Sequence, residues 1–461
     1  MAGTAGLNPV PTDLLLMSSS PPGPRGEPLF GSSRRYARDP FRFLSACEKA
    51  YDDVVQFDLG PMNTYLLTEP TEIERVLVSE ADRYAKPEFQ GDALGELLGK
   101  GLLLSEGQTW RKQRQLASPA FEMDRLIDFA DDIVTHNDDL LETWAEGDEV
   151  DVEMAMTEVT LAIIVDLMLG TDLSDERVRT IRGALEPMGA RFEPDPIRFA
   201  APEWLPMPGD GEYDQALDTM EAVIDDIVRE RRVTAGAPDG DDGPQDLLSI
   251  LLRDQQRGEQ TERPIRDEVM TILLAGHDTT ALTLTYTWYL LSQHPEAERR
   301  LHEELDDKVG DGRPTMADVT RLDYTESVID EAMRLYPPVY TMFREPTEPV
   351  ELGGYRIPEG AAIMLSQWAM HRSERFWDRP ERFEPERWDR NVDRPNFAYF
   401  PFGGGPRHCI GKHLAKLEAK LILARTAQNY ALEYTRDGEP DLWPTLTMHP
   451  RNGMPMRVHE R

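Results

Sequence analysis

The longest helix expected from this sequence covers about residues 263–293, and it constrains the fold more than any other segment. It begins near Pro264, and proline is well suited to the first turn of a helix. It ends before Pro295, where the helical backbone hydrogen bonding cannot continue. Thirty helical residues span about 45 Å, which is enough to cross the whole protein. The sequence therefore predicts a mainly helical body around one long helix.

The remaining patterns predict further helices and a smaller β region. Apolar residues recur at helical spacing over about 107–182 and 212–233. Alternating stretches at 54–59 and 64–68 predict a hairpin, and short strands are expected around 349–365. The Pro- and Gly-rich stretch 184–212 is expected to be a long loop. We predict a Pro/Gly/Ser-rich leader over residues 1–30 and one domain, mainly α with a small β region, over residues 31–461.

The cysteine content and the hydropathy pattern bear on the cellular compartment. Two distant cysteines, Cys47 and Cys409, do not form a disulfide framework, so a reducing compartment is expected. No apolar run is long enough to cross a bilayer, and the apolar residues 14–17 are too few for a signal peptide. We therefore expect a cytoplasmic protein without a membrane anchor.

The net charge is −35, with 85 acidic against 50 basic residues. Because the acidic residues are spread between clear helical patterns, they indicate a folded acidic surface and not a disordered chain. Self-repulsion of this size is tolerable when salt screens it, so one hypothesis is a halophilic cytoplasm. The alternative is an ordinary acidic protein. Nucleic acid is not expected as a partner, because its phosphates would be repelled.

A Gly-rich turn, Phe402 to Gly411, presents Cys409 just before a helical pattern that begins at about Lys412. The dipole and the free N–H groups at a helix N-terminus favour a thiolate. A thiolate is the haem ligand that promotes cleavage of the O–O bond. The glycines allow a flat cofactor to approach the backbone, and Arg407 can pair with a propionate of the cofactor.

Other interpretations of this turn are weaker. A single cysteine in such a turn is often only a buried side chain. Cys409 and His413 have the spacing for two zinc ligands, but two ligands do not complete a site. A Gly-rich loop before a helix can also bind phosphate, but neither the P-loop pattern nor the dinucleotide pattern matches.

The turn resembles the signature F-x-x-G-x-R-x-C-x-G of the cytochrome P450 family, with Phe402, Gly405, Arg407, Cys409 and Gly411 at the fixed positions. The resemblance extends over about residues 30 to 455. It implies the P450 fold, with haem b (iron protoporphyrin IX) between the long helix and the Cys-bearing loop. It also implies that Cys409 binds the iron and that Phe402, Arg407 and Gly411 contact the cofactor.

Polar residues interrupt the apolar middle of the long helix in the run Ala275 to Thr280. Such residues cost stability unless they have a role there. The run resembles the oxygen-activation motif of the family. By this resemblance Thr279 stabilises the activated oxygen by hydrogen bonding and Asp278 relays protons. Ala275 and Gly276 would lie beside the haem, with Gly276 leaving room for dioxygen.

Three further features fit the family in order along the chain. Glu331 and Arg334 share a helix face, and the family has a buried ion pair there whose third member we expect to be Arg382. Trp110 and Arg114 also share a helix face, and the family places this pair on a haem propionate. Arg344 corresponds to another arginine that binds a propionate in family members.

Electrons are expected from a separate protein, because no flavin or nicotinamide motif follows the cysteine motif. Lys412, Lys416 and Lys420 form one helix stripe directly after Cys409, where reductants dock in the family. We hypothesise that an acidic ferredoxin docks on this stripe. The alternative is a solvated face whose lysines pair with nearby acids such as Glu418.

The substrate is expected to be a hydrophobic small molecule: a fatty acid, terpenoid, steroid or carotenoid. The expected pocket residues, each of which could equally be an ordinary core residue, are Leu94, Leu97, Leu98, Leu102, Leu103, Ala275, Val339 and Met342. The implied reaction inserts one atom of O2 into this substrate. Rival functions are a peroxide-using or isomerising haem-thiolate enzyme, and a non-enzymatic haem sensor or carrier. Asp278 and Thr279 argue against these rivals, which have less need of a proton relay.

Overall fold

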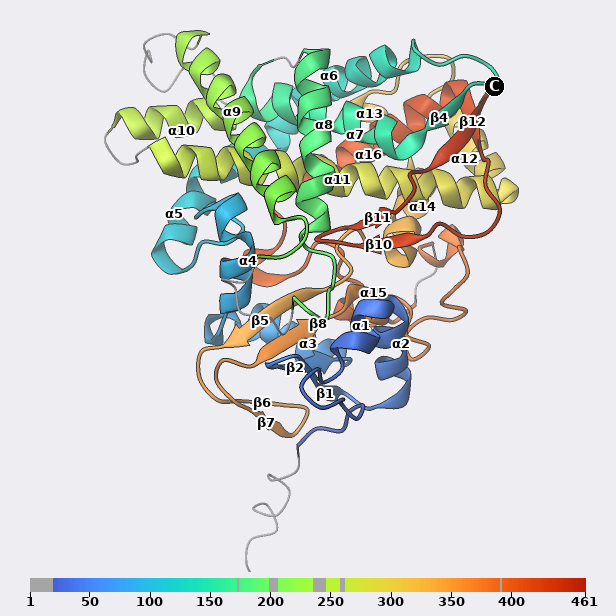
Figure 1. Ribbon diagram of the computed structural model, residues 1–461. Helices are drawn as coiled ribbons and strands as arrows, with labels where there is room; N and C mark the ends of the chain where they lie inside the picture. The colour runs from blue at the N-terminus through green and yellow to red at the C-terminus, as the bar shows by residue number, and fades with distance from the viewer. Residues whose placement is uncertain (1–19, 172–173, 199–205, 235–245, 258–261, 390–391) are drawn as a thin grey trace, which may run out of the picture.

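A computed structural model describes residues 20–171, 174–198, 206–234, 246–257, 262–389 and 392–461 of the chain. It is mainly helical with small sheets, as the sequence predicts (Figure 1). The helices are α1 Ser33–Arg38, α2 Pro40–Ala50, α3 Pro70–Glu74, α4 Glu88–Leu98, α5 Gly107–Ala117, α6 Met123–Leu141, α7 Val152–Ile164, α8 Asp175–Ala190, α9 Asp210–Thr234, α10 Leu247–Gln256, α11 Glu262–Gln293, α12 Pro295–Lys308, α13 Met316–Val319, α14 Asp323–Leu335, α15 Gln367–Met370 and α16 Lys412–Asn429. The strands are β1 Val54–Leu59, β2 Met62–Leu67, β3 Tyr84–Ala85, β4 Glu149–Asp151, β5 Met342–Pro346, β6 Val350–Leu352, β7 Tyr355–Ile357, β8 Ala362–Leu365, β9 Tyr430–Tyr434, β10 Leu442–Pro444, β11 Met448–Pro450 and β12 Pro455–Glu460.

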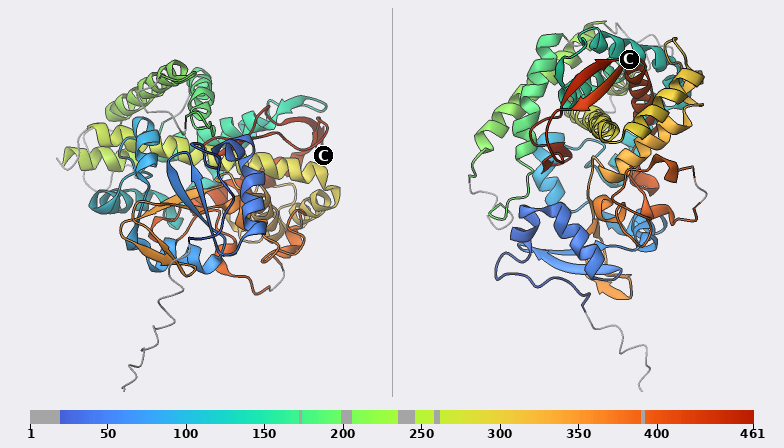
Figure 2. Two further views of the ribbon diagram at one scale, coloured as in Figure 1. Left: turned by 60° about the horizontal axis from the view of Figure 1, so that its bottom comes forward. Right: turned by 90° about the vertical axis from the view of Figure 1, so that its right-hand side faces the viewer.

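The long helix α11 is the axis of the helical part, which confirms the sequence prediction. It crosses this part from side to side in Figure 1, and the right-hand view of Figure 2 looks along it. Helices α7, α9, α14 and α16 pack against α11. Most side chains between Ile265 and Leu291 are therefore buried, including the large rings of Tyr286 and Trp288. A helix that is apolar on nearly all sides is stable only in such surroundings.

The largest sheet lies apart from the long helix and has the strand order β1-β2-β8-β5-β3. The predicted hairpin is formed by β1 and β2, which pair antiparallel, and β2 pairs parallel with β8. The backbone N–H of Gln56 on β1 donates to the carbonyl of Pro22 at 2.9 Å, so residues before 31 pack along this sheet. Residues 1–19 of the expected leader lie outside the described residues, and the boundary at residue 31 stays a prediction.

The loop predicted over 184–212 is shorter than expected. Helix α8 continues to Ala190 despite Pro187, and α9 begins at Asp210. The apolar face of α8 explains the difference, because Ala184 and Met188 are buried there. Tertiary packing thus offsets the cost of the proline. Residues 199–205 of this stretch lie outside the described residues.

A buried ion network holds α14 against the chain that leads to the cysteine motif. Arg334 and Glu331 are fully buried and joined by two hydrogen bonds of 2.9 Å. The Glu331 carboxylate also accepts from Nε of Arg387 at 2.8 Å and from the indole N–H of Trp388 at 3.1 Å. Such a charge is stable inside a protein because each of its lone pairs has a donor.

The third member of this network is Arg387, so the prediction of Arg382 was wrong. The Arg382 side chain is exposed, and only its backbone carbonyl takes part, accepting from Arg334 at 3.1 Å. The two arginines occupy equivalent places in the repeated sequences P-E-R-F and P-E-R-W. The side chain of Phe383 is buried, and the path of the backbone after it decides which of the two arginine side chains reaches Glu331.

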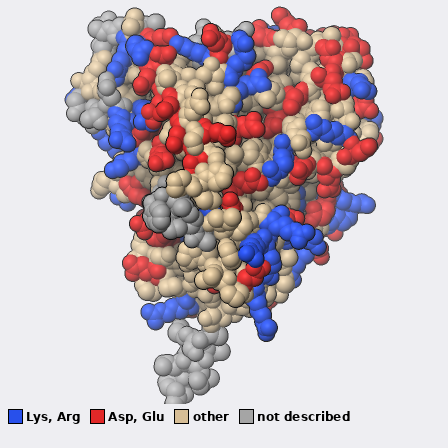
Figure 3. Space-filling view, viewed as in Figure 1, with Lys and Arg blue, Asp and Glu red and all other residues tan. Residues whose placement is uncertain are grey.

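Acidic and basic side chains are interspersed over the face of the molecule shown in Figure 3. Many form ion pairs between elements, such as Arg177 with Glu230 and Arg313 with Asp138. Among the helices of the described residues, none combines the length and the apolar character that a membrane span requires.

Candidate active site

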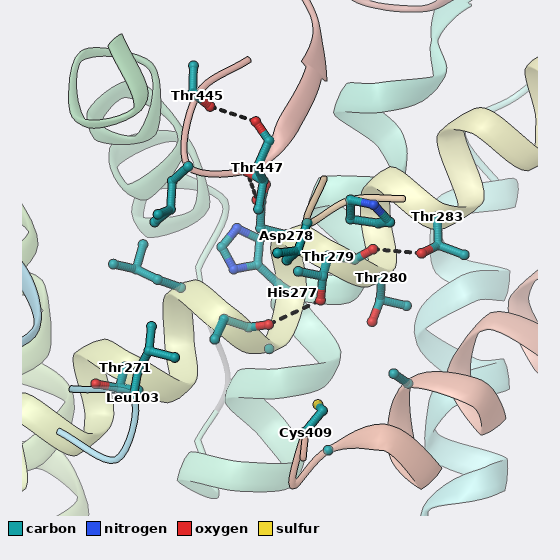
Figure 4. A pocket seen from close by; sticks show the side chains of 18 of the residues that line it. Leu103, Thr271, His277, Asp278, Thr279, Thr280, Thr283, Cys409, Thr445 and Thr447 are labelled. Atoms are coloured by element: carbon teal, nitrogen blue, oxygen red, sulfur yellow. Dashed lines mark hydrogen bonds between the residues drawn. The ribbon is translucent and has the colours of Figure 1, made fainter. Parts of the chain in front are cut away.

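A cavity of about 700 Å³ lies between α11 and the loop that carries Cys409. Figure 4 shows Cys409 on one side of it and the α11 segment His277 to Thr280 on the other. All eight residues expected to line a substrate pocket do line it. Leu94, Leu97, Leu98 and Leu102 are nevertheless nearly fully buried, whereas Leu103 and Ala275 are exposed to the space. The part of the cavity wall that these residues form is thus largely hydrocarbon.

The Cys409 loop is shaped by close backbone contacts. Gly405 has φ +66°, and a Cβ there would lie 1.8 Å from the carbonyl oxygen of Leu77. This position therefore requires glycine for both its conformation and its space. The backbone N–H of Cys409 donates to the carbonyl of Phe402 at 3.0 Å, which closes the turn. Helix α16 begins three residues after the cysteine.

The charge state of the Cys409 thiol is set by opposing effects. Burial raises the pKa of the thiol above its ordinary value. The N–H of Gly411, at the N-terminus of α16, and the charges of Arg114 and Lys412 act in the opposite direction. The predicted preference for thiolate is therefore present in the hydrogen bonding, but burial outweighs it in the protein chain alone. A bound cation would supply the missing stabilisation.

Cationic side chains gather on one wall of the cavity. Arg344 is 8% exposed, and among the described residues it pairs with no carboxylate and donates only to the Phe343 carbonyl. Burial, then repulsion by Arg407, lowers the pKa of Arg344 to about 10. Burial, then repulsion by Arg344 and Arg407, lowers the pKa of Lys86 to about 7. Anionic carboxylates here would relieve this repulsion, so the wall fits the propionates of a haem.

The other predicted propionate contacts lie in the same cavity. The guanidinium of Arg407 stacks on the Trp110 ring at 4.6 Å and hydrogen-bonds to the Ser105 carbonyl at 2.8 Å. It also pairs with Glu106. Arg114 donates to the His408 carbonyl at 2.9 Å. Trp110 and Arg114, which share one face of α5, are thus brought beside the Cys409 loop.

The polar segment of α11 faces the cavity in part. The Thr279 hydroxyl donates to the Ala275 carbonyl one turn earlier, at 3.2 Å. The Thr280 hydroxyl is buried and has no hydrogen-bond partner among the described residues. Gly276 lines the cavity, and the expectation that it leaves room for dioxygen stays a prediction. A Cβ at Gly276 would lie 2.8 Å from the Ile164 side chain, so glycine here permits close packing of α11 on α7.

Asp278 is held by residues from distant parts of the chain. Thr447, between β10 and β11, donates to Oδ2 of Asp278 at 2.6 Å, and His449 forms an ion pair with Oδ1 at 3.4 Å. Nδ1 of His449 lies 2.8 Å from Oε1 of Glu153 at the start of α7. Burial would raise the pKa of Asp278, but the charge and hydrogen bond of His449, the charge of His277 and the hydrogen bond of Thr447 together outweigh burial and lower it to about 2.

The lysine stripe on α16 is not the free docking surface that we hypothesised. Lys416 pairs with Glu326 and Asp330, and Lys420 is buried and pairs with Glu326 at 3.0 Å. Only Lys412 of the three is exposed. The alternative of a paired face fits better, but the acids come from α14. The expected acid Glu418 is buried.

Comparison with known proteins decides the family. The family model for cytochrome P450 matches residues 21–455. The chain belongs to the cytochrome P450 family. As a P450, it is a haem-dependent monooxygenase.

Three P450 relatives come from Streptomyces. Cyclooctatin synthase of Streptomyces melanosporofaciens is 35% identical over 417 residues, covering 89% of this chain and 89% of the relative. Cyclooctat-9-en-7-ol 5-monooxygenase of the same organism is 34% identical, covering 90% of this chain and 92% of the relative. Pentalenene oxygenase of Streptomyces avermitilis is 30% identical, covering 93% of this chain and 95% of the relative.

The zinc alternative for Cys409 gains no support from the fold. Within the described residues no group of three or more His, Cys, Asp or Glu side chains could hold a metal ion. A single thiol can provide one ligand to an iron whose other ligands come from a porphyrin. The cationic wall of the same cavity suits the carboxylates of that porphyrin.

Several site residues have no local sequence signal. Lys86, Glu153, Thr447 and His449 line the cavity, yet none lies in a motif. They meet Asp278 or Arg344 only through folding, from positions far away along the chain. Only the three-dimensional structure shows that a histidine pairs with buried acids here.

Proposed function

We propose that this P450 hydroxylates an apolar terpenoid with electrons from a separate ferredoxin-type protein in the cytoplasm. The observation that carries the substrate class is the hydrocarbon part of the cavity wall, rich in leucine from residues 94–104, in the cavity that Cys409 also lines. The names of the three relatives above, which act on or form terpenoid compounds, support the same class. Both described cysteines are free, which agrees with a reducing compartment.

The cofactor is proposed to be haem b; Cys409 would bind its iron, and Phe402 and Gly411 would contact the cofactor. Arg344, Arg407, Trp110 and Arg114 would hold its propionates. When bound, the haem supplies the activation of O2, and the protein supplies orientation, a dry site and protons. Thr279 is proposed to turn its hydroxyl from the Ala275 carbonyl and donate a hydrogen bond into the cavity, with Asp278 as proton relay.

Ligation by Cys409 can be tested by the spectrum of the reduced protein with CO. The native protein is expected to give the band of a thiolate-ligated haem, and Cys409→His the band of an imidazole-ligated haem. A thiolate band that persisted in C409H would refute Cys409 as the ligand.

The substrate class can be tested by binding and turnover. A cyclic terpene hydrocarbon should displace water from the haem, seen as a spin-state change, and should be hydroxylated with a surrogate ferredoxin and its reductase. Leu103→Asp should weaken terpene binding about tenfold, because it places a charge on the apolar wall. Leu29→Asp is the matched control, since Leu29 is 89% exposed and does not line the cavity. Exclusive turnover of a fatty acid would refute the terpenoid class, and turnover with peroxide alone would favour the peroxide-using alternative.

The partner surface is proposed to centre on Lys412 and Arg111. Both side chains are exposed, and Arg111 lies on α5, the helix whose Arg114 contacts His408 beside Cys409. A double exchange of Lys412 and Arg111 for glutamate should slow reduction by the ferredoxin several-fold without changing the haem spectrum. Arg356→Glu, on the exposed face of β7, is the matched control. Equal reduction rates in all three proteins would show that the partner docks elsewhere.

A further inference from the structure

A continuous line of hydrogen bonds leads from Asp278 to two groups without a role in the reaction described so far. The Thr447 hydroxyl donates to Oδ2 of Asp278 at 2.6 Å and lies 3.0 Å from Nε2 of His449 (Figure 4 shows Asp278 and Thr447). On the other side of its ring, Nδ1 of His449 lies 2.8 Å from Oε1 of Glu153. Helix α11, the β10–β11 hairpin and helix α7 each contribute to this line.

Opposing effects set the charges along the line; burial raises the pKa of Glu153, and the hydrogen bond and charge of His449 oppose this. Both ring nitrogens of His449 face acceptors, which is the arrangement of an imidazolium that donates on both sides. Burial would lower the pKa of His449, but Asp278 and then Glu153 raise it to about 10. With the pKa of Asp278 lowered to about 2, the pair is an imidazolium and a carboxylate at neutral pH.

The other ionisable groups around the line do not alter this state. His277 on α11 is buried, and burial lowers its pKa, so it stays neutral. Asp151 precedes α7 and caps it by accepting from backbone N–H groups. Tyr286 donates to the Met448 carbonyl at 2.9 Å, and Arg451 after β11 pairs with Glu193.

An ionised Asp278 cannot itself be the source of a proton, because it must first receive one. We propose that His449 supplies this proton through the hydroxyl of Thr447, and that Glu153 is the positioning residue that holds the imidazole ring. The proposal rests on the oxygenase function above, which consumes protons in the cavity that Asp278 borders.

The transfer balances along the hydrogen bonds. The proton on Nε2 of His449 passes to Oγ1 of Thr447 while the hydroxyl proton of Thr447 passes to Oδ2 of Asp278. Thr447 is thereby unchanged, Asp278 is neutral and can pass its proton to the cavity, and His449 is neutral with Nδ1–H still on Glu153. Water that enters the cavity then returns a proton to Nε2, because the His449 side chain lines this cavity and is 25% exposed.

The competing explanation is that Asp278 and His449 form a purely structural ion pair. Substitutions of Thr447 distinguish this explanation from the proton relay. Thr447→Val removes the hydroxyl but keeps the shape of the side chain, whereas Thr447→Ser keeps the hydroxyl. His449→Gln and Glu153→Gln test the donor and its positioning residue. His459→Gln is the matched control, because His459 also bridges two carboxylates, Glu146 and Glu433, but is exposed and outside the cavity.

The experiment uses the haem-loaded enzyme with a terpene substrate and a surrogate ferredoxin. T447V and H449Q are expected to form product at least about tenfold more slowly, with electrons diverted to peroxide and a larger solvent isotope effect. T447S and H459Q should resemble the native enzyme. Substrate binding is measured separately by the spin-state change, and product formation is compared at saturating substrate.

A second readout does not depend on turnover. Side-chain ¹⁵N NMR of the CO-bound ferrous enzyme should show His449, assigned by its loss in H449Q, as an imidazolium at neutral pH. In E153Q its pKa should fall, and the alkaline decline of turnover should shift to lower pH with it. Both changes follow because one of the two carboxylates that stabilise the imidazolium is lost.

The outcomes separate this proposal from the proposed function. If the native enzyme turns over and T447V forms product with native coupling and isotope effect, the relay is refuted while the oxygenase function stands. A neutral His449 at neutral pH would also refute the relay. If the native enzyme oxidises no apolar substrate, the proposed function fails. Independently of turnover, a pKa of His449 that is the same in E153Q and in the native enzyme would reject the positioning role of Glu153.

Discussion

At the scale of single residues, the charge of Glu331 is held by several hydrogen-bond donors at once. Its carboxylate is fully buried and receives hydrogen bonds from Arg334, Arg387, Trp388 and the backbone of Glu384. The helical spacing of Glu331 and Arg334 makes their contact predictable from sequence. The identity of the third cation is not predictable in this way, because two arginines five residues apart in one loop have similar sequence surroundings.

Replacing Arg387 by alanine should strongly destabilise the protein. It leaves part of the Glu331 charge unpaired in the interior, which costs about 3–5 kcal/mol in comparable cases. Denaturant unfolding followed by circular dichroism measures the change. Arg382→Ala is the matched control and should shift stability by less than about 0.5 kcal/mol, because its side chain is exposed. Equal losses in both variants would contradict the assignment of Arg387.

At the scale of elements, the position of the cysteine depends on a tight turn that contains only one short 3-10 helix, Gly405–Arg407. The turn passes so close to Leu77 that Gly405 has no space for a side chain. Across the cavity, the loop after α4 is fixed to α11 by two carboxylates. The backbone N–H of Lys100 donates to Asp267 at 2.8 Å, and that of Leu102 to Glu268 at 3.0 Å.

Gly405→Ala should prevent correct assembly of the haem site. The new Cβ would meet the Leu77 carbonyl, and neither backbone can move without displacing Cys409. Gly403→Ala is the matched control, since Gly403 has the same φ of +66° but its nearest contact is 3.6 Å away, at the Met342 side chain. We expect G403A to cost about 1–2 kcal/mol and to keep the thiolate spectrum with CO, and G405A to lose that spectrum. A thiolate spectrum in both would contradict the requirement for space.

Glu268 should make stability depend on pH. Burial raises the pKa of Glu268 from 4.5 to about 7, and the N–H of Leu102 opposes this in part. The pKa of Glu268 is higher in the folded state than in the unfolded state. The contribution of the protonated side chain to the free energy of unfolding is therefore complete below about pH 4.5 and is lost as pH rises through about 7. Glu268→Gln cannot ionise and avoids this loss.

The difference in thermal midpoint between E268Q and the native protein should therefore increase from about pH 5 to about pH 8, by the equivalent of up to about 3 kcal/mol. Glu359→Gln, in an exposed turn, is the matched control and should show no such trend. A constant difference for E268Q across this range would contradict the raised pKa.

At the scale of the whole molecule, a net charge of −35 opposes the compact state. Surface pairs such as Arg177 with Glu230 reduce this repulsion locally but cannot neutralise an excess of acids. Counter-ions in solution must screen the rest. The need for screening is the physical basis of the hypothesis that the cytoplasm has a high salt concentration. This hypothesis stays a prediction.

Raising KCl from about 0.1 M to about 1 M shortens the Debye length from about 10 Å to about 3 Å. The thermal midpoint and haem retention of the native protein should increase with it, the midpoint by at least about 5 °C. An uncharged osmolyte at equal osmolality is the control, because it does not screen charge. A midpoint that is insensitive to KCl would favour an ordinary acidic protein.

The sequence by itself determined the features that depend on neighbours along the chain. These are the long helix between Pro264 and Pro295, the Gly-rich turn before α16, and the helix faces that pair Glu331 with Arg334 and Trp110 with Arg114. Local spacing sets each of them, because helical periodicity places residues three and four apart on one face.

Tertiary structure alone decided contacts between distant segments. It directed Arg387 and not Arg382 to Glu331, paired Lys416 and Lys420 with acids of α14, and set Gly276 against Ile164. It also brought Thr447 and His449 to Asp278. The physical reason is that the pairing of buried charges depends on backbone paths through the whole fold, and no periodicity within one segment encodes them.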